Sequence, residues 1–128
     1  MNLRLFFLSL FLLCGISLSA TNRYAVQIDF KKAYISGVCI MHQEEAVTTA
    51  SIMNEFGVSA LTYRYDSKTG KVRIISIIKQ LDKWYIRRIL KKDLRAIMQS
   101  MPTDDSLNYE NKKYHIIYNY TPLHDETA

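Results

Sequence analysis

The sequence predicts an α+β fold: a curved antiparallel β-sheet (a half-barrel) of about six strands with one principal amphipathic helix. Two observations predict these elements. Several short segments alternate apolar and polar residues, as strands with one buried face do, whereas residues 82–101 repeat their apolar residues at helical spacing. A third observation concerns the whole chain: no Pro- or Gly-rich linker and no internal repeat divides its 128 residues, which favours a single domain.

The predicted strands follow one another along the chain. In the first, Tyr24, Val26, Ile28 and Phe30 fall on one face. The six expected strands are 24–30, 33–42, 46–54, 60–66, 72–79 and 113–120. A hairpin turn is expected around residues 43–45 and another over residues 66–71. Residues 102–112 are polar and acidic, so we expect a loop there, before the last strand.

The predicted helix covers residues 82–101. Asp82 is expected to be its N-cap, Leu81 and Ile86 to pack across that cap, and Pro102 to end the run. Its apolar residues form one stripe, and lysines and arginines occupy the rest of its surface. The stripe is therefore expected to face the sheet.

The first 20 residues have the order of parts of a secretory signal. Arg4 precedes an apolar run over residues 5–13, and small residues follow up to Ala20. The run is shorter than the about 20 apolar residues of a membrane-spanning helix. We therefore expect residues 1–20 to be a removed signal peptide and residues 21–128 to be one exported domain, periplasmic or secreted. Lipid attachment at Cys14 is the alternative for this N-terminus.

The charge composition indicates which kinds of partner the protein is expected to bind. Seventeen Lys and Arg residues against 12 Asp and Glu residues give a formal net charge of +5. In an exported protein this excess points to anionic membrane surfaces rather than to nucleic acid. Cys39 is the single cysteine of the predicted exported domain, so the domain has no internal disulfide and depends on its core. Because Cys39 lies within an apolar strand, we expect it to be inert.

The widths of the predicted elements suggest a site. Six strands spaced by about 4.8 Å make a sheet ~30 Å wide, whereas one helix is only about 10 Å across. The sheet must therefore curl, dimerise or be covered by an apolar ligand. We expect a bent sheet around the helix that leaves part of its concave face for a lipid-like guest. Strand alternation and the loop residue Phe56 give the expected cavity lining: Val26, Ile28, Phe30, Phe56, Leu61, Tyr63, Tyr65, Ile74, Tyr114, Ile116 and Tyr118.

The residues Asn-Glu-Phe-Gly, 54–57, join two predicted strands. Asn54 and Gly57 tolerate positive φ, and Phe56 is expected to fold back toward the apolar face. Glu55 has no partner group that would make it a catalytic acid. We therefore expect these four residues to shape the sheet.

The predicted elements are, in order, a signal peptide, a strand pair and residues 54–77, which lead into an amphipathic helix. This order of elements resembles the periplasmic lipoprotein-carrier fold of LolA and LolB. The resemblance is one of pattern and covers roughly residues 33–98. It implies a half-barrel whose concave face holds acyl chains beneath a helical lid, and non-catalytic lipid or lipoprotein binding. It carries over no binding residue.

The leading functional prediction is non-enzymatic binding or carriage of a lipid or acylated protein in the periplasm. The helix is expected to contact anionic membrane surfaces through Arg87, Arg88, Lys91, Lys92 and Arg95. The alternative is a protein-interaction module that pairs through its sheet face or edge, including as a homodimer.

An enzyme is not expected, because no nucleophile–base pair or carboxylate cluster emerges from the sequence. His42, His115 and His124 are far apart and have no ligand-spaced partners, so neither a metal site nor a cofactor is predicted.

Overall fold

The computed structural model describes residues 19–101 and 105–123. Its strands are β1 (Ser19–Asp29), β2 (Tyr34–Glu44), β3 (Val47–Met53), β4 (Ser59–Asp66), β5 (Lys71–Ile77), β6 (Leu107–Asn111) and β7 (Ile116–Pro122). The helices are the short 3-10 helix η1 (Lys79–Leu81) and the α-helix α2 (Trp84–Ser100). The predicted signal peptide, with Cys14, lies outside the described residues except for Ser19 and Ala20, which begin β1.

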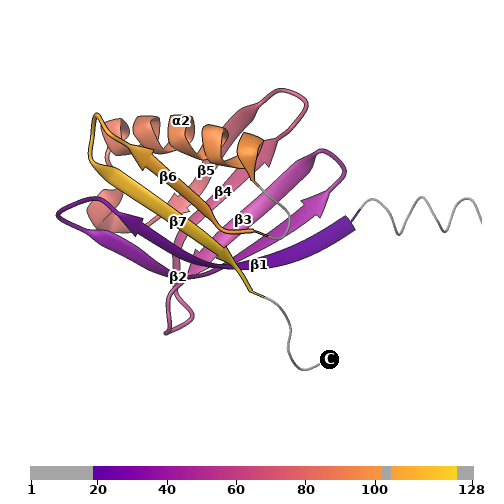
Figure 1. Ribbon diagram of the computed structural model, residues 1–128, viewed down its shortest axis with the longest axis horizontal. Helices are drawn as coiled ribbons and strands as arrows, with labels where there is room; N and C mark the ends of the chain where they lie inside the picture. The colour runs from indigo at the N-terminus through magenta and orange to yellow at the C-terminus, as the bar shows by residue number, and fades with distance from the viewer. Residues whose placement is uncertain (1–18, 102–104, 124–128) are drawn as a thin grey trace, which may run out of the picture.

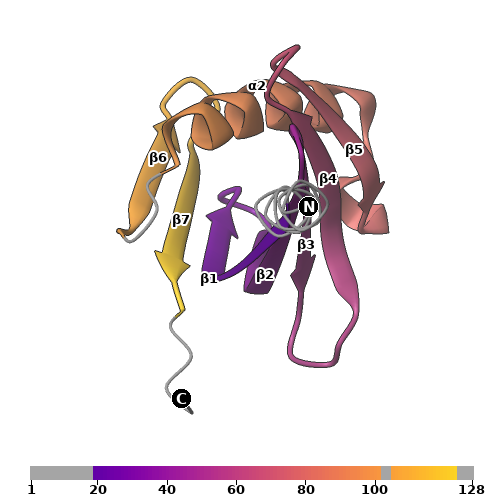
Figure 2. The same ribbon diagram turned by 90° about the vertical axis from the view of Figure 1, so that its right-hand side faces the viewer.

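The seven strands form one sheet in the order β5-β4-β3-β2-β1-β7-β6, and each neighbouring pair is antiparallel. The sheet curls, and α2 lies across its opening, between β4 and β5 on one side and β6 and β7 on the other (Figures 1 and 2). The helix contacts both edge strands, β5 and β6. The predicted α+β half-barrel with one principal helix is therefore confirmed.

The number of strands differs from the prediction, because β6 lies in the segment that was expected to be a loop. Leu107, Tyr109 and Asn111 are half-buried and alternate with exposed residues. Tyr109 is paired with Tyr118 of β7. Only Leu107 and Tyr109 are apolar among the inward positions of β6, so the alternation is too short to recognise until β7 is placed beside it.

The start of α2 also differs from the prediction. Lys83, not Asp82, is the N-cap residue, and its side chain makes no capping hydrogen bond. The backbone N–H of Asp82 donates to Lys79 O as η1 ends, and the Asp82 carboxylate accepts a hydrogen bond from Arg87 Nε at 2.6 Å. The 3-10 turn therefore delays the helix, and Asp82 pairs with a side chain one turn into it.

The inner face of the sheet and the apolar stripe of α2 form one closed core. The helix contributes Leu90, Leu94 and Ile97, all fully buried. The tyrosine side chains within this core find partners for their hydroxyls, as buried tyrosines usually do: the Tyr63 and Tyr120 oxygens are 3.1 Å apart. The helix therefore covers the hollow of the curled sheet with its apolar side (Figure 2).

Residues 54–57 form the loop between β3 and β4. The Asn54 side-chain oxygen accepts hydrogen bonds from the backbone N–H groups of Phe56 and Val58 at 2.9 and 3.0 Å. Gly57 has φ +76°, a conformation that glycine adopts without strain. These contacts shape the connection, as expected. The expectation for Phe56 was wrong: the loop directs it outward, where its side chain is 81% exposed.

Candidate functional site

Most residues of the predicted cavity lie in the closed core instead. They are at most 8% exposed: Val26, Ile28, Leu61, Tyr63, Tyr65, Ile74, Ile116 and Tyr118. Among the others, Phe30 is half-buried, Tyr114 is 47% exposed, and Phe56 lies in the outward-directed loop. Strand alternation therefore identified the inner face correctly but did not show where that face stays open.

An open groove lies at one end of the half-barrel, between the first half of α2 and the β6–β7 hairpin. Its volume is about 990 Å³, a size at which clefts in proteins bind small molecules. We call it the α2–hairpin groove. Three of the predicted cavity residues, Phe30, Tyr114 and Ile116, line it.

The groove has an apolar interior. Ile86 and Ile89 reach it from α2, Phe30 from the end of β1, and Tyr109 and Ile116 from the hairpin. All except the buried Ile116 are partly exposed and pack against the core. The groove is therefore continuous with the apolar interior but remains open to a ligand.

The rim of the groove is mainly basic. Arg88 and Lys92 lie along one side, on α2, and Lys112 and Lys113 along the other, in the β6–β7 turn. Glu110 is the one exposed acidic residue that lines it. The structure thus brings two of the predicted membrane-contacting residues, Arg88 and Lys92, together with two lysines that the sequence did not single out.

The remaining predicted membrane-contacting residues lie elsewhere. Arg87 is paired with Asp82, which keeps the pKa of the Asp82 carboxyl below its ordinary value. Lys91 lies on the exposed side of α2. The Arg95 guanidinium lies over Gly70 in the β4–β5 turn, toward the far end of the helix.

A buried carboxylate lies in the floor of the groove. Asp93 of α2 accepts a hydrogen bond from the Tyr118 hydroxyl at 2.7 Å and two from the Asn111 side-chain amide, both at 3.0 Å. Burial and this hydrogen bond to Asp93 raise the pKa of Tyr118, so the phenol remains protonated. The cluster ties α2 to both strands of the hairpin and so fixes the width of the groove.

The sequence contains one signal for the role of Asp93. Buried Leu90, Leu94 and Ile97 flank it at helical spacing, so its carboxylate falls inside the apolar stripe, where a charged residue must find partners. The identity of those partners depends on the hairpin, whose first strand the pattern did not predict.

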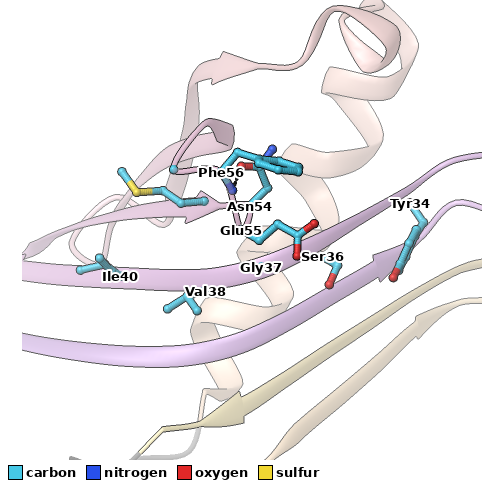
Figure 3. Close-up of a pocket in the computed structure, with 10 residues that line it drawn as sticks. Tyr34, Ser36, Gly37, Val38, Ile40, Asn54, Glu55 and Phe56 are labelled. Atoms are coloured by element: carbon cyan, nitrogen blue, oxygen red, sulfur yellow. Dashed lines mark hydrogen bonds between the residues drawn. The ribbon is translucent and has the colours of Figure 1, made fainter.

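A second hollow lies on the outer face of the sheet (Figure 3). It has a volume of about 660 Å³ and is bounded by β2 and the β3–β4 loop. Its apolar lining includes Tyr34, Val38, Met53 and Phe56, all of them exposed. Gly37 of β2 lies beneath this hollow, next to the end of β3. A Cβ atom at this position would lie 2.0 Å from the Met53 carbonyl oxygen, so only glycine fits there.

Two further reactive side chains that the structure describes, Cys39 and His42, lie in different surroundings. Cys39 is fully buried, and burial raises its pKa from 9.0 to about 12, which fits the expected inert role. His42 lies on the exposed side, where its ring contacts Thr21 and Glu44 at 3.0 and 3.1 Å. His124 lies outside the described residues.

The described residues contain neither a metal-binding cluster nor a membrane-spanning helix. Between residues 19 and 123, apart from 102–104, no group of three or more His, Cys, Asp or Glu side chains lies together in a way that could hold a metal ion. No helix within those ranges is both long and apolar enough to span a bilayer.

Comparisons with known proteins gave no significant match to any family model, curated protein or solved structure. The resemblance to LolA and LolB therefore stays a prediction from the sequence pattern.

Proposed function

We propose that this protein is a non-enzymatic binding protein for an amphiphile, a lipid or an acylated protein, in the periplasm or outside the cell. The ligand's apolar part occupies the α2–hairpin groove. The observation that carries the proposal is the pairing of an apolar interior with a basic rim in one open groove.

The chemistry of the groove matches the two parts of an amphiphile. An acyl chain removes apolar surface from water when it lies against Phe30, Ile86 and Ile89, at roughly 25 cal/mol per Å². An acidic head group meets Arg88, Lys92 and the turn lysines, which donate charge-assisted hydrogen bonds. A purely polar ligand would leave the apolar interior exposed, and a purely apolar ligand would leave the rim unused.

The lining also favours binding over catalysis. Among the residues that the structure describes, the lining contains no Ser, Thr or Cys nucleophile and no His, the commonest general base. Asp93 is the buried acid of the groove, and both of its oxygens already accept hydrogen bonds from Asn111. These residues hold the groove in shape.

Native mass spectrometry tests the proposal. The full chain is expressed in a bacterial host that exports it, and the purified protein is examined before and after solvent extraction. We expect an added mass that extraction removes and that returns when palmitate is added. An Ile89→Glu variant, which places a charge in the apolar interior, should not regain it, and a Val38→Glu variant in the outer hollow should. A protein that never takes up palmitate or a phospholipid would refute the proposal.

A second candidate function rests on the outer hollow. Tyr34, Val38 and Phe56 are exposed and line the same hollow (Figure 3), and exposed apolar patches often mark protein interfaces. The occupant would be another polypeptide, including a second copy of this chain. Sedimentation of the wild type and of a Phe56→Ser variant tests it: a dimer that the substitution dissociates supports this function, and a wild-type monomer that binds palmitate argues against it.

A further inference from the structure

Six exposed lysines from distant parts of the sequence gather at one end of the molecule. Lys31 and Lys32 lie in the β1–β2 turn, Lys79 in η1, Lys83 just before α2, and Lys112 and Lys113 in the β6–β7 turn. These turns and the start of α2 lie together at the left of Figure 1. We call this the lysine end.

Three carboxylates offset the lysine end only in part. Asp29, Asp82 and Glu110 lie at or beside it, and Asp82 is paired with Arg87, so the six lysines outnumber the carboxylates that remain. The opposite end, at the right of Figure 1, carries the β2–β3 and β4–β5 turns. Glu44, Glu45 and Asp66 there offset the few lysines.

Exposed aromatic rings lie among these lysines. Trp84 and Tyr85 open α2, are 75% and 45% exposed, and pack edge to face with ring centroids 5.8 Å apart. Tyr114 extends from the β6–β7 turn, and the Lys113 ammonium lies 5.4 Å from its ring centroid. All three rings line the mouth of the α2–hairpin groove.

We infer that the lysine end docks on an anionic lipid bilayer, with Trp84, Tyr85 and Tyr114 entering the head-group region. Trp and Tyr prefer this depth because their rings are apolar and their N–H and O–H groups reach water. Lysines beside them gain from the negative surface potential of the bilayer. A folded protein partner would also accept lysines, but an exposed Trp–Tyr pair within a ring of lysines matches the layered chemistry of a membrane interface best.

This docking surface lies beside the proposed ligand site and differs from the membrane-contacting surface that the sequence suggested. The sequence favoured the whole basic side of the helix, including Lys91 and Arg95. The structure places the aromatic residues and most of the lysines around the first turn of α2 only. The groove opens at this same end, so an amphiphile could pass between bilayer and groove without crossing water.

The chain contains one tryptophan, Trp84, so its fluorescence reports the docking directly. The full-length expressed protein, after solvent extraction of bound lipid, is mixed with vesicles of phosphatidylglycerol and phosphatidylcholine in equal parts. We expect it to float with the vesicles and its emission to shift to shorter wavelength. Vesicles of phosphatidylcholine alone should bind at least tenfold more weakly, and raised salt should release the protein.

Two matched charge reversals locate the surface. Lys112→Glu with Lys113→Glu should weaken binding to the mixed vesicles at least about tenfold. Lys68→Glu with Lys71→Glu changes the net charge equally at the opposite end and should have little effect. Equal losses in both variants would show attraction without a docking surface, and flotation without a Trp84 shift would place another surface on the bilayer. Either result, or no flotation at all, overturns the inference.

These outcomes are separate from those of the ligand test. A protein that takes up palmitate but does not float with vesicles retains the proposed function and loses the docking surface. A protein that floats but never binds palmitate retains the docking surface alone.

Discussion

The closed core and the α2–hairpin groove are two parts of one apolar face, and they differ in how far their side chains are buried. Under the second half of α2, Leu94 and Ile97 fill the hollow of the sheet and are fully buried. Beside the first half, Ile86 and Ile89 are only partly buried, and the β6–β7 hairpin stands far enough away to leave about 990 Å³ open. The same apolar chemistry therefore stabilises the fold in one place and is available to a ligand in the other.

The comparison shows what a single helix can do on a curled sheet. Its later turns close the core, and its first turn, which carries the exposed Trp84 and Tyr85, lies at the open end. Asp93 stands between the two regions and joins the helix to the hairpin through Tyr118 and Asn111. If this division is correct, substitutions in the core should cost stability and substitutions in the groove should cost binding.

The largest effect is expected in the core. Leu94→Ala removes a fully buried side chain and should lower the free energy of unfolding by about 2 to 5 kcal/mol. Ile89→Ala, in the groove, should cost distinctly less because Ile89 is only partly buried. Urea unfolding of both variants measures the difference. Equal losses would mean that the groove is as tightly packed as the core.

The next effect concerns the junction of the two regions. Asp93→Ala leaves the buried Tyr118 hydroxyl without an acceptor, which should cost about 1 to 3 kcal/mol. The Asn111 amide, which also loses its acceptor, is only half-buried and should add little. The exposed Glu110, on the same hairpin, provides the control, and Glu110→Ala should change stability little. If the Asp93→Ala variant unfolds at the same urea concentration as the wild type, the cluster does not join α2 to the hairpin as described.

A smaller effect should follow from pH, and it arises in the core. Burial raises the pKa of Cys39 from 9.0 to about 12, and the pKa values of Tyr63 and Tyr120 also rise through burial. These groups keep their protons in the folded state. In the unfolded chain they lose them once the pH exceeds their ordinary pKa values. Stability is therefore full below about pH 9 and declines between pH 9 and 12, by about 1 kcal/mol at pH 10 for Cys39 alone.

Urea midpoints at pH 8 and pH 10 measure this decline. A Cys39→Ala variant should lose less of its stability over the same interval, since one of the responsible groups is gone. A wild-type midpoint that stays constant or rises at pH 10 would show that these side chains are not sealed from water.

The smallest change in stability is expected at the rim of the groove. Tyr114 is largely outside the core, so Tyr114→Ala should alter the free energy of unfolding by no more than about 0.5 kcal/mol. Palmitate affinity should nevertheless fall several-fold, because the ring lines the groove. Isothermal titration and urea unfolding of the same sample separate the two quantities. A large loss of stability with unchanged palmitate affinity would show that Tyr114 belongs to the core and not to the groove.

Periodicity in the sequence predicted the elements that depend on local pattern. Alternation in β1 identified Val26 and Ile28 as inward residues, and helical spacing located α2. It did not reveal β6, because this edge strand is only five residues long and has just two apolar inward residues, Leu107 and Tyr109, before it ends at the inward Asn111. The prediction that Phe56 faces the apolar side of the sheet was wrong because residue type alone does not determine the direction of a loop. The hydrogen bonds that Asn54 accepts set that direction.

The candidate site was only partly predictable because it depends on contacts between distant segments. Phe30 and Tyr114 were expected to line a cavity, and Arg88 and Lys92 to bind head groups, as two separate surfaces. They meet because the curl of the sheet brings the end of β1 and the β6–β7 turn to the first turn of α2. No local pattern encodes that meeting.

Photo-cross-linking with a palmitate analogue that carries a diazirine near the middle of its chain tests the account most directly. After irradiation of the loaded full-length protein, the account predicts labelled peptides that contain Ile86, Ile89 or Tyr109, on the walls of the groove. Label confined to Val38, Met53 or Phe56 would place the ligand in the outer hollow and contradict the account, as would labelling equal to that of unfolded protein.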